Sequence, residues 1–477
     1  MRQRLISNVI WKIAERMLAQ IVSLVVSVVL ARLLAPDDYG ALSMVIVFIA
    51  IANVFVTNGL PSALIQKKDA DEMDFSSCFY LNLLLSIILY SIIFIAAPYI
   101  ASFYGNSILQ PVIRVLGCQV VIASVNGVQH SYVARNMMFK RYFLATLFGT
   151  VVSGVVGITM AYKGMGVWAL VAQYMLNTAI DTIVLFFTVE WRPKPFFSLQ
   201  RVRELFRFGW KILFESVSNT AAGQLQNLVI GKAYTTADLA FFTKGQHFPN
   251  LIVNNITSSI GAVLFPAFSN EQENKTKVLE MLRKSVRMSY YVVYPMLTGL
   301  AAVSTPFIKL LMTEKWLETV PYLQIFCLLH APAVAMIPRH QALNGTGRSD
   351  IFMKEHIFAR AVAIAILFLT YRISIMAILL GSILSTIILT IVVAYTSKQY
   401  NEYGYKDQIM DIMPTLCGCI VMGIPVYLLG NIGLASGTTL AMQVVAGIFV
   451  YYLYSRITDI AEYKICRQYV HSLLRPE

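Results

Sequence analysis

Charged residues are scarce in this sequence. Only 13% of its 477 residues are Asp, Glu, Lys or Arg, whereas 57% are hydrophobic. A soluble domain has about 25% charged residues, and a chain of this length cannot hide so much apolar surface in one water-soluble core. The composition therefore excludes an ordinary soluble protein and indicates that lipid surrounds most of the chain.

Several features of enzymes and metalloproteins are also missing from the sequence. The six cysteines have no metal-ligand spacing with histidine, so we expect no metal site. Gly-rich phosphate loops, HExxH and GxSxG motifs are absent, and no loop is long enough for a folded soluble domain. We therefore expect a protein without a cofactor that is not an enzyme. A membrane-embedded enzyme of envelope polysaccharide synthesis is kept as an alternative.

Apolar segments of about 20 residues recur along the whole chain, which is the length that a helix needs to cross ~30 Å of hydrocarbon. Helices are expected because lipid offers no partner for an unpaired backbone group. The predicted fold is an all-α polytopic membrane protein with about 14 transmembrane helices. The spans lie near 10–34, 41–65, 76–100, 111–132, 143–162, 166–189, 209–231, 239–265, 286–311, 319–343, 352–370, 373–396, 409–430 and 438–458.

Positive charge is nearly absent from every second loop. If the N-terminus is cytoplasmic, the inside loops and both tails contain 25 Lys and Arg residues, whereas the outside loops contain only Lys163, Lys232, Lys315 and Arg372. This asymmetry follows the positive-inside rule and predicts an even number of spans with both termini in the cytoplasm. The net charge of +13 therefore labels one membrane face, and no nucleic-acid partner is expected.

Longer inside loops divide the predicted spans into groups of six, six and two. The predicted divisions are an N-terminal lobe at 1–195, a C-terminal lobe at 196–400, and two further spans with a cytoplasmic tail at 401–477. The lobes also share a pattern at an offset of about 200 residues: WKI at 11–13 matches WKI at 210–212, and DYGALSMV falls opposite DLAFFTKG. This predicts an internal repeat, as transporters often have.

The break between the first two spans reads ARLLAPDDYG. Pro36 and Gly40 interrupt the helix, and Asp37 and Asp38 are suited to cap the next one. Arg32 lies in the last turn of the first span, where its positive charge interacts favourably with the C-terminal end of the helix dipole. The segment is therefore predicted to be a capped outside hairpin.

The same segment carries a family resemblance, through the hairpin ARLLxPxDYG and the motif NGLxxALIQ at the end of the second span. Together with the arrangement of six, six and two spans, it resembles the polysaccharide exporter branch of the multidrug/oligosaccharidyl-lipid/polysaccharide (MOP) superfamily. Wzx-type exporters of O-antigen, colanic acid and teichuronic acid belong to this branch. The resemblance extends over essentially the whole chain, and its motifs do not specify the sugar.

The resemblance implies a MOP/MATE-like fold of two six-helix lobes in a V, plus two extra C-terminal helices. It implies a flippase that moves an undecaprenyl-pyrophosphate-linked oligosaccharide across the cell inner membrane by alternating access. The expected partners are this substrate, membrane lipid, H⁺ or Na⁺ as coupling ion, a polysaccharide polymerase and glycosyltransferases. A drug/cation antiporter and a flippase for the lipid-linked peptidoglycan precursor are alternatives on the same scaffold.

The seventh and eighth spans contain the densest polar faces, with Lys211, Glu215 and Asn219 on one and Lys244 and His247 on the other. A Lys or Glu deep in a span costs roughly 2.5–3.5 kcal/mol and so normally faces a cavity or a partner. These residues are therefore candidates for a polar path that binds the substrate. The alternative is that Lys211 only forms a structural ion pair with Glu215, one turn away.

Four further cations, Arg16, Arg114, Arg339 and Arg360, lie near the ends of their spans. They are substrate-binding candidates for the two mouths of a cavity, and the alternative is that each extends to the lipid headgroups. Asp181 lies well inside the sixth span and is the candidate acid for coupling transport to an ion. The alternative is that Asp181 is a structural residue whose carboxyl group is hydrogen-bonded within the helix packing.

Overall fold

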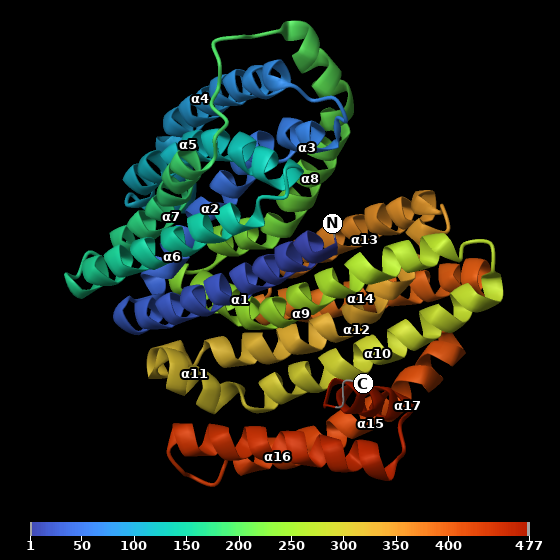
Figure 1. Cartoon of the computed structure of the whole chain (residues 1–477). Coiled ribbons are helices and arrows are strands. Elements are labelled where there is room, and N and C mark those ends of the chain that lie inside the picture. Colours follow the sequence, from blue (N-terminus) through green and yellow to red (C-terminus); the bar gives the residue numbers. More distant parts are fainter. Residues whose placement is uncertain (1, 475–477) are drawn as a thin grey trace. The chain divides into compact units, whose positions relative to one another are not determined.

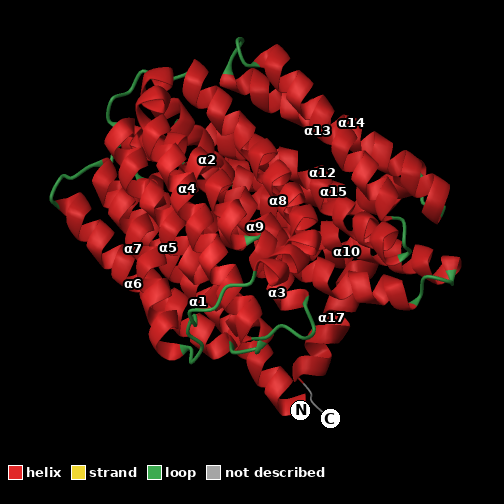
Figure 2. Cartoon of the chain, turned by 90° about the horizontal axis from the view of Figure 1, so that it is seen from above, coloured by secondary structure: helices red, strands yellow, loops and turns green. Residues whose placement is uncertain are grey.

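Helices joined by short loops make up nearly all of the chain (Figure 2). The structure is a computed structural model that describes the backbone of residues 2–474, and the side chains of residues 18–468 except Phe139, Phe208, Ala335 and Asn401. It has two compact units, Met1–Ala240 (unit 1) and Phe241–Glu477 (unit 2). The three predicted divisions with boundaries at 195 and 400 stay a prediction.

Unit 1 contains eight helices and the first residues of a ninth (Figure 1). They are α1 (Arg2–Leu33), α2 (Pro36–Thr57), α3 (Gly59–Gln66), α4 (Glu72–Tyr104), α5 (Leu109–Arg135), α6 (Phe139–Tyr162), α7 (Val167–Thr188), α8 (Leu199–Ala233) and the start of α9 (Thr236–Asn270). Helix α5 packs against α2, α4 and α7, while α8 packs against α2, α3 and α4.

Unit 2 contains the rest of α9 and the helices that follow it. They are α10 (Lys275–Ala302), α11 (Ser304–Met312), α12 (Thr319–Gly345), α13 (Ser349–Thr370), α14 (Ile375–Asn401), α15 (Tyr405–Leu429), α16 (Ser436–Ile457) and α17 (Ala461–Leu474), with a short 3₁₀ turn at Glu314–Trp316. Helix α10 packs against α12 and α15, and α13 packs against α14.

The predicted spans coincide with helices throughout the described chain. Among the described residues, 10 helices are long and apolar enough to cross a membrane, and the bent pair α10 and α11, with an angle of 70° between them, makes up to 11. The other three predicted spans are α1, α8 and α13. Within the described side chains, α1 has a shorter apolar stretch, Leu18–Leu33, whereas α8 and α13 contain the polar residues expected of helices that line a polar path. The count of about 14 is thus roughly met.

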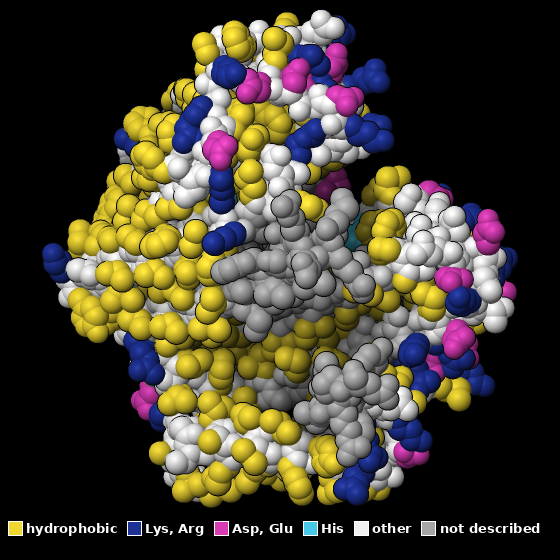
Figure 3. Space-filling view, viewed as in Figure 1, with side chains coloured by type: hydrophobic (Ala, Val, Ile, Leu, Met, Phe, Trp, Pro, Cys, Tyr) yellow, Lys and Arg dark blue, Asp and Glu magenta, His cyan; other side chains and the backbone are white. Residues whose placement is uncertain are grey.

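Apolar side chains cover the flank of unit 1 (Figure 3). On α4 alone, Leu84, Ile88, Ile92 and Ile95 are exposed. In water such a surface would be unfavourable by about 25 cal/mol for each Å², but hydrocarbon is a good solvent for it. The charged side chains visible over this unit gather mainly toward the end where α8 begins, as expected for a chain that crosses a membrane.

The α1–α2 and α8–α9 hairpins have the same geometry at an offset of 200 residues. Helices α1 and α8 end at Leu33 and Ala233, and each following helix begins three residues later. In both hairpins an aspartate side chain accepts a backbone N–H three residues before it: Ala35 to Asp38 at 3.1 Å and Thr235 to Asp238 at 3.1 Å. The predicted local equivalence of these segments is confirmed in the hairpins.

A second pair of turns repeats at an offset of 210 residues. Helices α5 and α12 end at Arg135 and Gly345, and the next helices begin at Phe139 and Ser349. The second residue after each helix end has a positive φ: 54° at Met137 and 76° at Gly347. The sequence motifs did not reveal this second correspondence.

Gly40 allows the two equivalent hairpins to approach each other within unit 1. A Cβ atom at this position would lie 1.8 Å from the backbone oxygen of Thr236. Because that oxygen belongs to the main chain, a side chain cannot be accommodated by a rotamer change alone. Gly40 is therefore needed for packing at this end of the unit.

We predict that Gly40→Ala lowers the stability of the protein by about 1–3 kcal/mol, the usual cost of overpacking. The matched control is Gly223→Ala in α8, where a new Cβ meets nothing within 4 Å and improves helix propensity. Thermal unfolding in detergent measures both. Equal melting temperatures for the two variants would contradict the close approach of the hairpins.

Candidate functional site

A pocket of about 420 Å³ lies among the helices of unit 1, and amide and hydroxyl side chains are set into its largely apolar wall. Five helices contribute to its wall: α2, α3, α5, α6 and α7. The lining residues are Asn53, Thr57, Pro61, Ser62, Ile65, Gln119, Ala123, Asn126, Gly127, His130, Ser131, Ala134, Tyr142 and Thr178. Half of them come from α5, so this helix forms the principal wall.

The spacing of residues along α5 explains its role. Gln119, Ala123, Asn126 and His130 recur at intervals of three or four and therefore share one helix face. Gly127 lets α5 approach the end of α2, because a Cβ there would lie 3.1 Å from the backbone oxygen of Val56. Small residues and polar residues on one face thus place α5 close to its neighbours while it presents hydrogen-bonding groups to the pocket.

The chemistry of the pocket is that of amides and hydroxyl groups. Its lining includes Asn, Gln, Ser, Thr, Tyr and one His, but neither Lys, Arg, Asp nor Glu. Some of these groups bond to one another: the Nε2 atom of Gln119 donates to Oγ1 of Thr178 at 2.8 Å. Such neutral donors and acceptors are suited to a ligand rich in hydroxyl groups and less suited to a multiply charged anion.

Asp181 lies behind the pocket wall, on α7. Its side chain is buried, and its Oδ2 atom accepts a hydrogen bond from Nδ2 of Asn126 at 2.6 Å and lies 2.8 Å from Nε2 of His130. The predicted acid is therefore brought into contact with two residues of the pocket. Asn177, one turn before it, instead lies 3.4 Å from the hydroxyl of Thr150 on α6.

Several buried polar atoms near this site have no hydrogen-bond partner within the described part of the chain. They are Oδ1 of Asn53, Oδ1 of Asn126, Nδ1 of His130 and Oδ1 of Asp181. An unsatisfied buried polar group costs about 1–3 kcal/mol, and native proteins contain few of them. These four atoms lie at the pocket or directly behind its wall, where a ligand, water or proton can complete the bonding.

The pocket contains none of the predicted substrate-binding residues. On α8, Lys211, Glu215 and Asn219 are all exposed, and among the described residues Lys211 and Glu215 form no ion pair within 4.0 Å. The alternative reading of these two as a structural pair therefore has no support here. On α9, Lys244 is partly buried and His247 is exposed.

The predicted arginines differ in their surroundings. Arg114 stacks on the ring of Phe94, with its guanidinium carbon 4.3 Å from the ring centroid. Arg339 is only 1% exposed, and its Nε and Nη1 atoms have no hydrogen-bond partner in the described part of unit 2. Arg360 is partly buried, and the side chain of Arg16 lies outside the described residues.

The sequence interpretation missed His130 and Asn126. Both belong to the polar face of α5, and the intervals of three and four residues that connect Gln119 with Asn126 and His130 were the available signal. Their contact with Asp181 could not be anticipated, since the two helices are separated by about 50 residues of chain and only packing brings them together.

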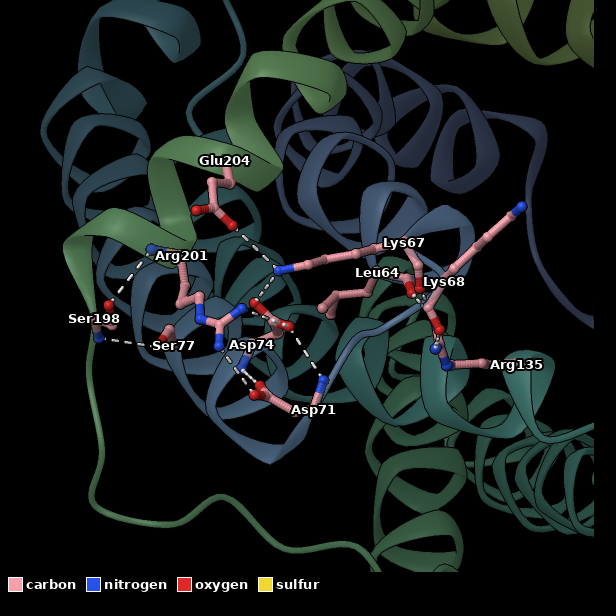
Figure 4. Close-up of polar contacts among 10 residues, drawn as sticks. All are labelled: Leu64, Lys67, Lys68, Asp71, Asp74, Ser77, Arg135, Ser198, Arg201 and Glu204. Atoms are coloured by element: carbon pink, nitrogen blue, oxygen red, sulfur yellow. Dashed lines mark hydrogen bonds and ion pairs between the residues drawn. The ribbon is translucent and has the colours of Figure 1, made fainter.

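Charged residues form a network at the end of unit 1 where α4 and α8 begin (Figure 4). Asp74 is completely buried, and its carboxylate lies 2.7 Å from Nζ of Lys67 and 4.0 Å from Nη1 of Arg201. Lys67 also lies 3.4 Å from Glu204 on α8. A buried carboxylate with two cationic neighbours holds the first turns of α4 and α8 together.

The same end contains two helix caps. Asp71 caps α4 by accepting the backbone N–H of Asp74 at 2.9 Å, which holds the pKa of Asp71 below its usual range. Arg135, at the end of α5, donates to the backbone oxygens of Leu64 at 2.9 Å and Lys68 at 2.5 Å. Backbone groups at the start of α4 and at the end of α3 are thereby satisfied.

The long apolar helices and the polar pocket define a multi-pass membrane protein with a hydrogen-bonding site inside its helices. Residues 29–321 match the model of a family described as Polysaccharide biosynthesis protein. Because this match covers more than half of the chain, the protein belongs to that family.

Three relatives with descriptive names are 23–26% identical to this chain over the aligned residues. The succinoglycan biosynthesis transport protein ExoT of Rhizobium meliloti is 23% identical over 72% of this chain and 70% of its own length. The teichuronic acid biosynthesis protein TuaB of Bacillus subtilis is 24% identical over 73% of both chains. The lipopolysaccharide biosynthesis protein WzxC of Escherichia coli is 26% identical over 89% of this chain and 88% of its own.

Two solved structures show what fold these helices form. The lipid II flippase MurJ, in an inward closed conformation, has a TM-score of 0.79 at 14% identity and covers 94% of this chain and 98% of its own. A multidrug resistance MATE family transporter of the MOP superfamily, in an inward-facing conformation, has a TM-score of 0.63 at 14% identity, over 82% and 99%. The fold is that of the MOP superfamily, as the sequence resemblance implied.

Proposed function

We propose that this protein translocates a lipid-linked oligosaccharide, the repeat unit of a polysaccharide on undecaprenyl pyrophosphate, across the cytoplasmic membrane by alternating access. The observation that carries the proposal is the neutral polar pocket inside the membrane-spanning helices of unit 1. Its family and the transport and biosynthesis names of its relatives point to the same cargo class.

The physical problem in this transport is the desolvation of sugar hydroxyl groups. A hydroxyl that crosses hydrocarbon without a partner costs several kcal/mol, and an oligosaccharide has many of them. A pocket of about 420 Å³ lined by amides and hydroxyls offers replacements for water while the lipid tail stays in the bilayer. We therefore assign the pocket to a sugar residue of the cargo.

Asn53 provides a test of this assignment, because its Oδ1 atom is buried at the pocket without a hydrogen-bond partner in the described chain. We predict that Asn53→Leu slows flipping about tenfold, the value of one hydrogen bond of about 1.4 kcal/mol. The assay is a proteoliposome containing lipid-linked oligosaccharide, in which an added glycosidase reports sugars that reach the outer leaflet.

The matched control is Ser91→Ala on α4, which removes a hydroxyl that only donates to the backbone oxygen of Ile87, outside the pocket. Its rate should equal that of the unmodified protein. If Asn53→Leu also flips at the full rate, the pocket does not hold sugar. A protein that moves a drug cation or the peptidoglycan precursor but not the oligosaccharide would favour the alternatives on the same scaffold.

The pyrophosphate of the cargo requires cations outside the pocket. We propose Lys211 and Lys244 as its first contacts, with Arg16, Arg114, Arg339 and Arg360 as further cations and Glu215, Asn219 and His247 as their polar neighbours. Lys211 is exposed on α8 and forms no described ion pair with Glu215, so its charge is available to a ligand.

We predict that Lys211→Ala loses most of the export activity at normal protein abundance, because no partner acid is left behind. Lys211→Arg should retain part of the activity, since the charge is kept. The control is the double variant Lys211→Ala with Glu215→Ala, which should be as inactive as the single variant. Export that returns in the double variant would show that Lys211 only neutralises Glu215, and cellular accumulation of lipid-linked oligosaccharide measures this.

Asp181 is the proposed coupling acid, and its neighbours favour H⁺ over Na⁺. Its carboxylate is met by Nδ2 of Asn126 and Nε2 of His130, which are nitrogen groups. Hard cations need several oxygen ligands, and among the described residues no group of three or more His, Cys, Asp and Glu side chains is placed to hold a metal ion. A carboxylate next to an imidazole is suited to exchange a proton.

We also propose that both termini and the charged network of unit 1 lie in the cytoplasm of the host cell. The α3–α4 turn and the α7–α8 loop share this network, and their lysines and arginines give the inside its positive charge. A polysaccharide polymerase and glycosyltransferases are the proposed protein partners in the same membrane.

This topology predicts which single cysteines react with a reagent that cannot cross the membrane. Positions in 35–38, 103–107 and 432–436 should be labelled in intact cells, whereas positions in 67–72 and 274–280 should react only after the membrane is opened. The native cysteines are replaced first. Labelling of Asn274→Cys from outside would overturn the orientation and the number of spans together.

A further inference from the structure

The second repeated turn places two histidines at equivalent positions, one in each unit. At the offset of 210 residues, His130 of α5 corresponds to His340 of α12. The same offset superposes Tyr142 of α6 on Phe352 of α13. Both histidines pack edge-on against the equivalent aromatic ring: the centroids are 4.6 Å apart at 61° for His130 and 4.9 Å apart at 77° for His340.

Each of these histidines lies beside a buried carboxylate. The Nε2 atom of His130 is 2.8 Å from Oδ2 of Asp181, and that of His340 is 3.5 Å from Oε2 of Glu355. Asp181 is 8% exposed and Glu355 is 3% exposed. A second polar side chain bonds to each acid: Asn126 donates to Asp181, and the hydroxyl of Thr396 donates to Glu355.

Both pairs are short of hydrogen-bond donors. In unit 1, Nδ1 of His130 and Oδ1 of Asp181 are buried without a partner, and in unit 2 the same holds for Nε2 of His340 and Oε2 of Glu355, within the described chain. A proton supplies such a donor, and so does a hydroxyl group of a ligand. A proton on the unpartnered carboxylate oxygen and a ligand hydroxyl that donates to the same oxygen compete for one acceptor, so binding of one weakens binding of the other.

The groups around the two pairs differ in charge. The side chain facing His130 from α6 is Tyr142, that from α7 is Asp181, and no Lys or Arg lines the adjoining pocket. His340 is next to Arg339 in the sequence of α12 and lies close to Glu355 and His356 on α13. Arg360 interacts with His356, and Thr396 on α14 donates to Glu355. Arg339 interacts in turn with Tyr290 of α10 and with Tyr403.

We propose that each unit has one exchangeable proton site, His130–Asp181 in unit 1 and His340–Glu355 in unit 2, so that two protons enter the cell for each headgroup that leaves. In each site the proton bound from the outside neutralises the histidine–carboxylate pair and is released to the cytoplasm unchanged, so no other reactant is needed. This inference rests on the proposed function.

The number of coupled protons is obtained from the steady-state ratio of headgroups in the receiving leaflet to headgroups in the other leaflet. Purified full-length protein is reconstituted with lipid-linked oligosaccharide, the membrane potential is set to zero, and the compartment that receives headgroups is made more acidic by about one pH unit. Because one pH unit is worth about 1.4 kcal/mol for each proton, each coupled proton contributes a factor of about ten. The leaflet ratio should be about 100 for the unmodified protein.

The variants separate the two sites. His130→Gln and His340→Gln should each reduce the final ratio to about ten, and the double variant should reach about one. Because His130 also lines the pocket, its variants are compared by the ratio that they finally reach and not by their rate. The matched control is His330→Gln on α12, because His330 stacks on Phe326 and has no acidic partner within 4.0 Å in the described chain. Its ratio should stay near 100.

The acid variants Asp181→Asn and Glu355→Gln test the same two sites independently. Each should give the same leaflet ratio as the variant of its histidine partner. A ratio near 100 in either single histidine variant would overturn the proposal for that unit. If the histidine and acid variants of a site both abolish exchange without a pH difference, that site serves only to hold the cargo, which would also overturn the proposal. Failure of the unmodified protein to flip the oligosaccharide rejects the proposed function, whereas flipping that ignores the pH difference rejects only the two-proton inference.

Discussion

The cost of leaving a polar group without a partner in hydrocarbon governs this structure. It forces the backbone into helices, and it makes each polar side chain within a span either bonded or functional. Most side-chain hydroxyls of the spans donate to a backbone oxygen on their own helix, as Thr150 does to Thr146. Among the described residues, the buried polar atoms without partners include those of Asn126, His130 and Asp181 on α5 and α7, and those of Arg339, His340 and Glu355 on α12 and α13.

The same constraint explains why sugar and pyrophosphate need different surroundings. Hydroxyl groups require many neutral partners at short range, which the pocket of unit 1 contains. A doubly charged headgroup requires cations, and these lie on other faces, such as Lys211 on α8. The separation fits a cargo whose sugar and phosphate parts lie several Å apart along one molecule. It also keeps strong positive charge away from Asp181.

Periodicity and charge in the sequence were sufficient to predict the helices, because span length and polar faces are local properties of the chain. Asp181 was found for the same reason, as an acid within an apolar run. Its partners His130 and Asn126 were not found, since their importance comes from contact between α5 and α7. The ion pair of Lys211 with Glu215, which the sequence left open as an alternative, is absent among the described residues, because a spacing of one turn permits a contact without requiring it.

The two histidine sites bear on how the chain arose. The imidazole and the aromatic ring beside it occupy matching positions in both halves, but the acid comes from α7 in one half and from α13 in the other. If an ancestral half was duplicated, the base and its ring stayed in place while the acid was recruited anew. A comparison of the halves residue by residue would therefore detect the histidines and overlook the acids that complete them.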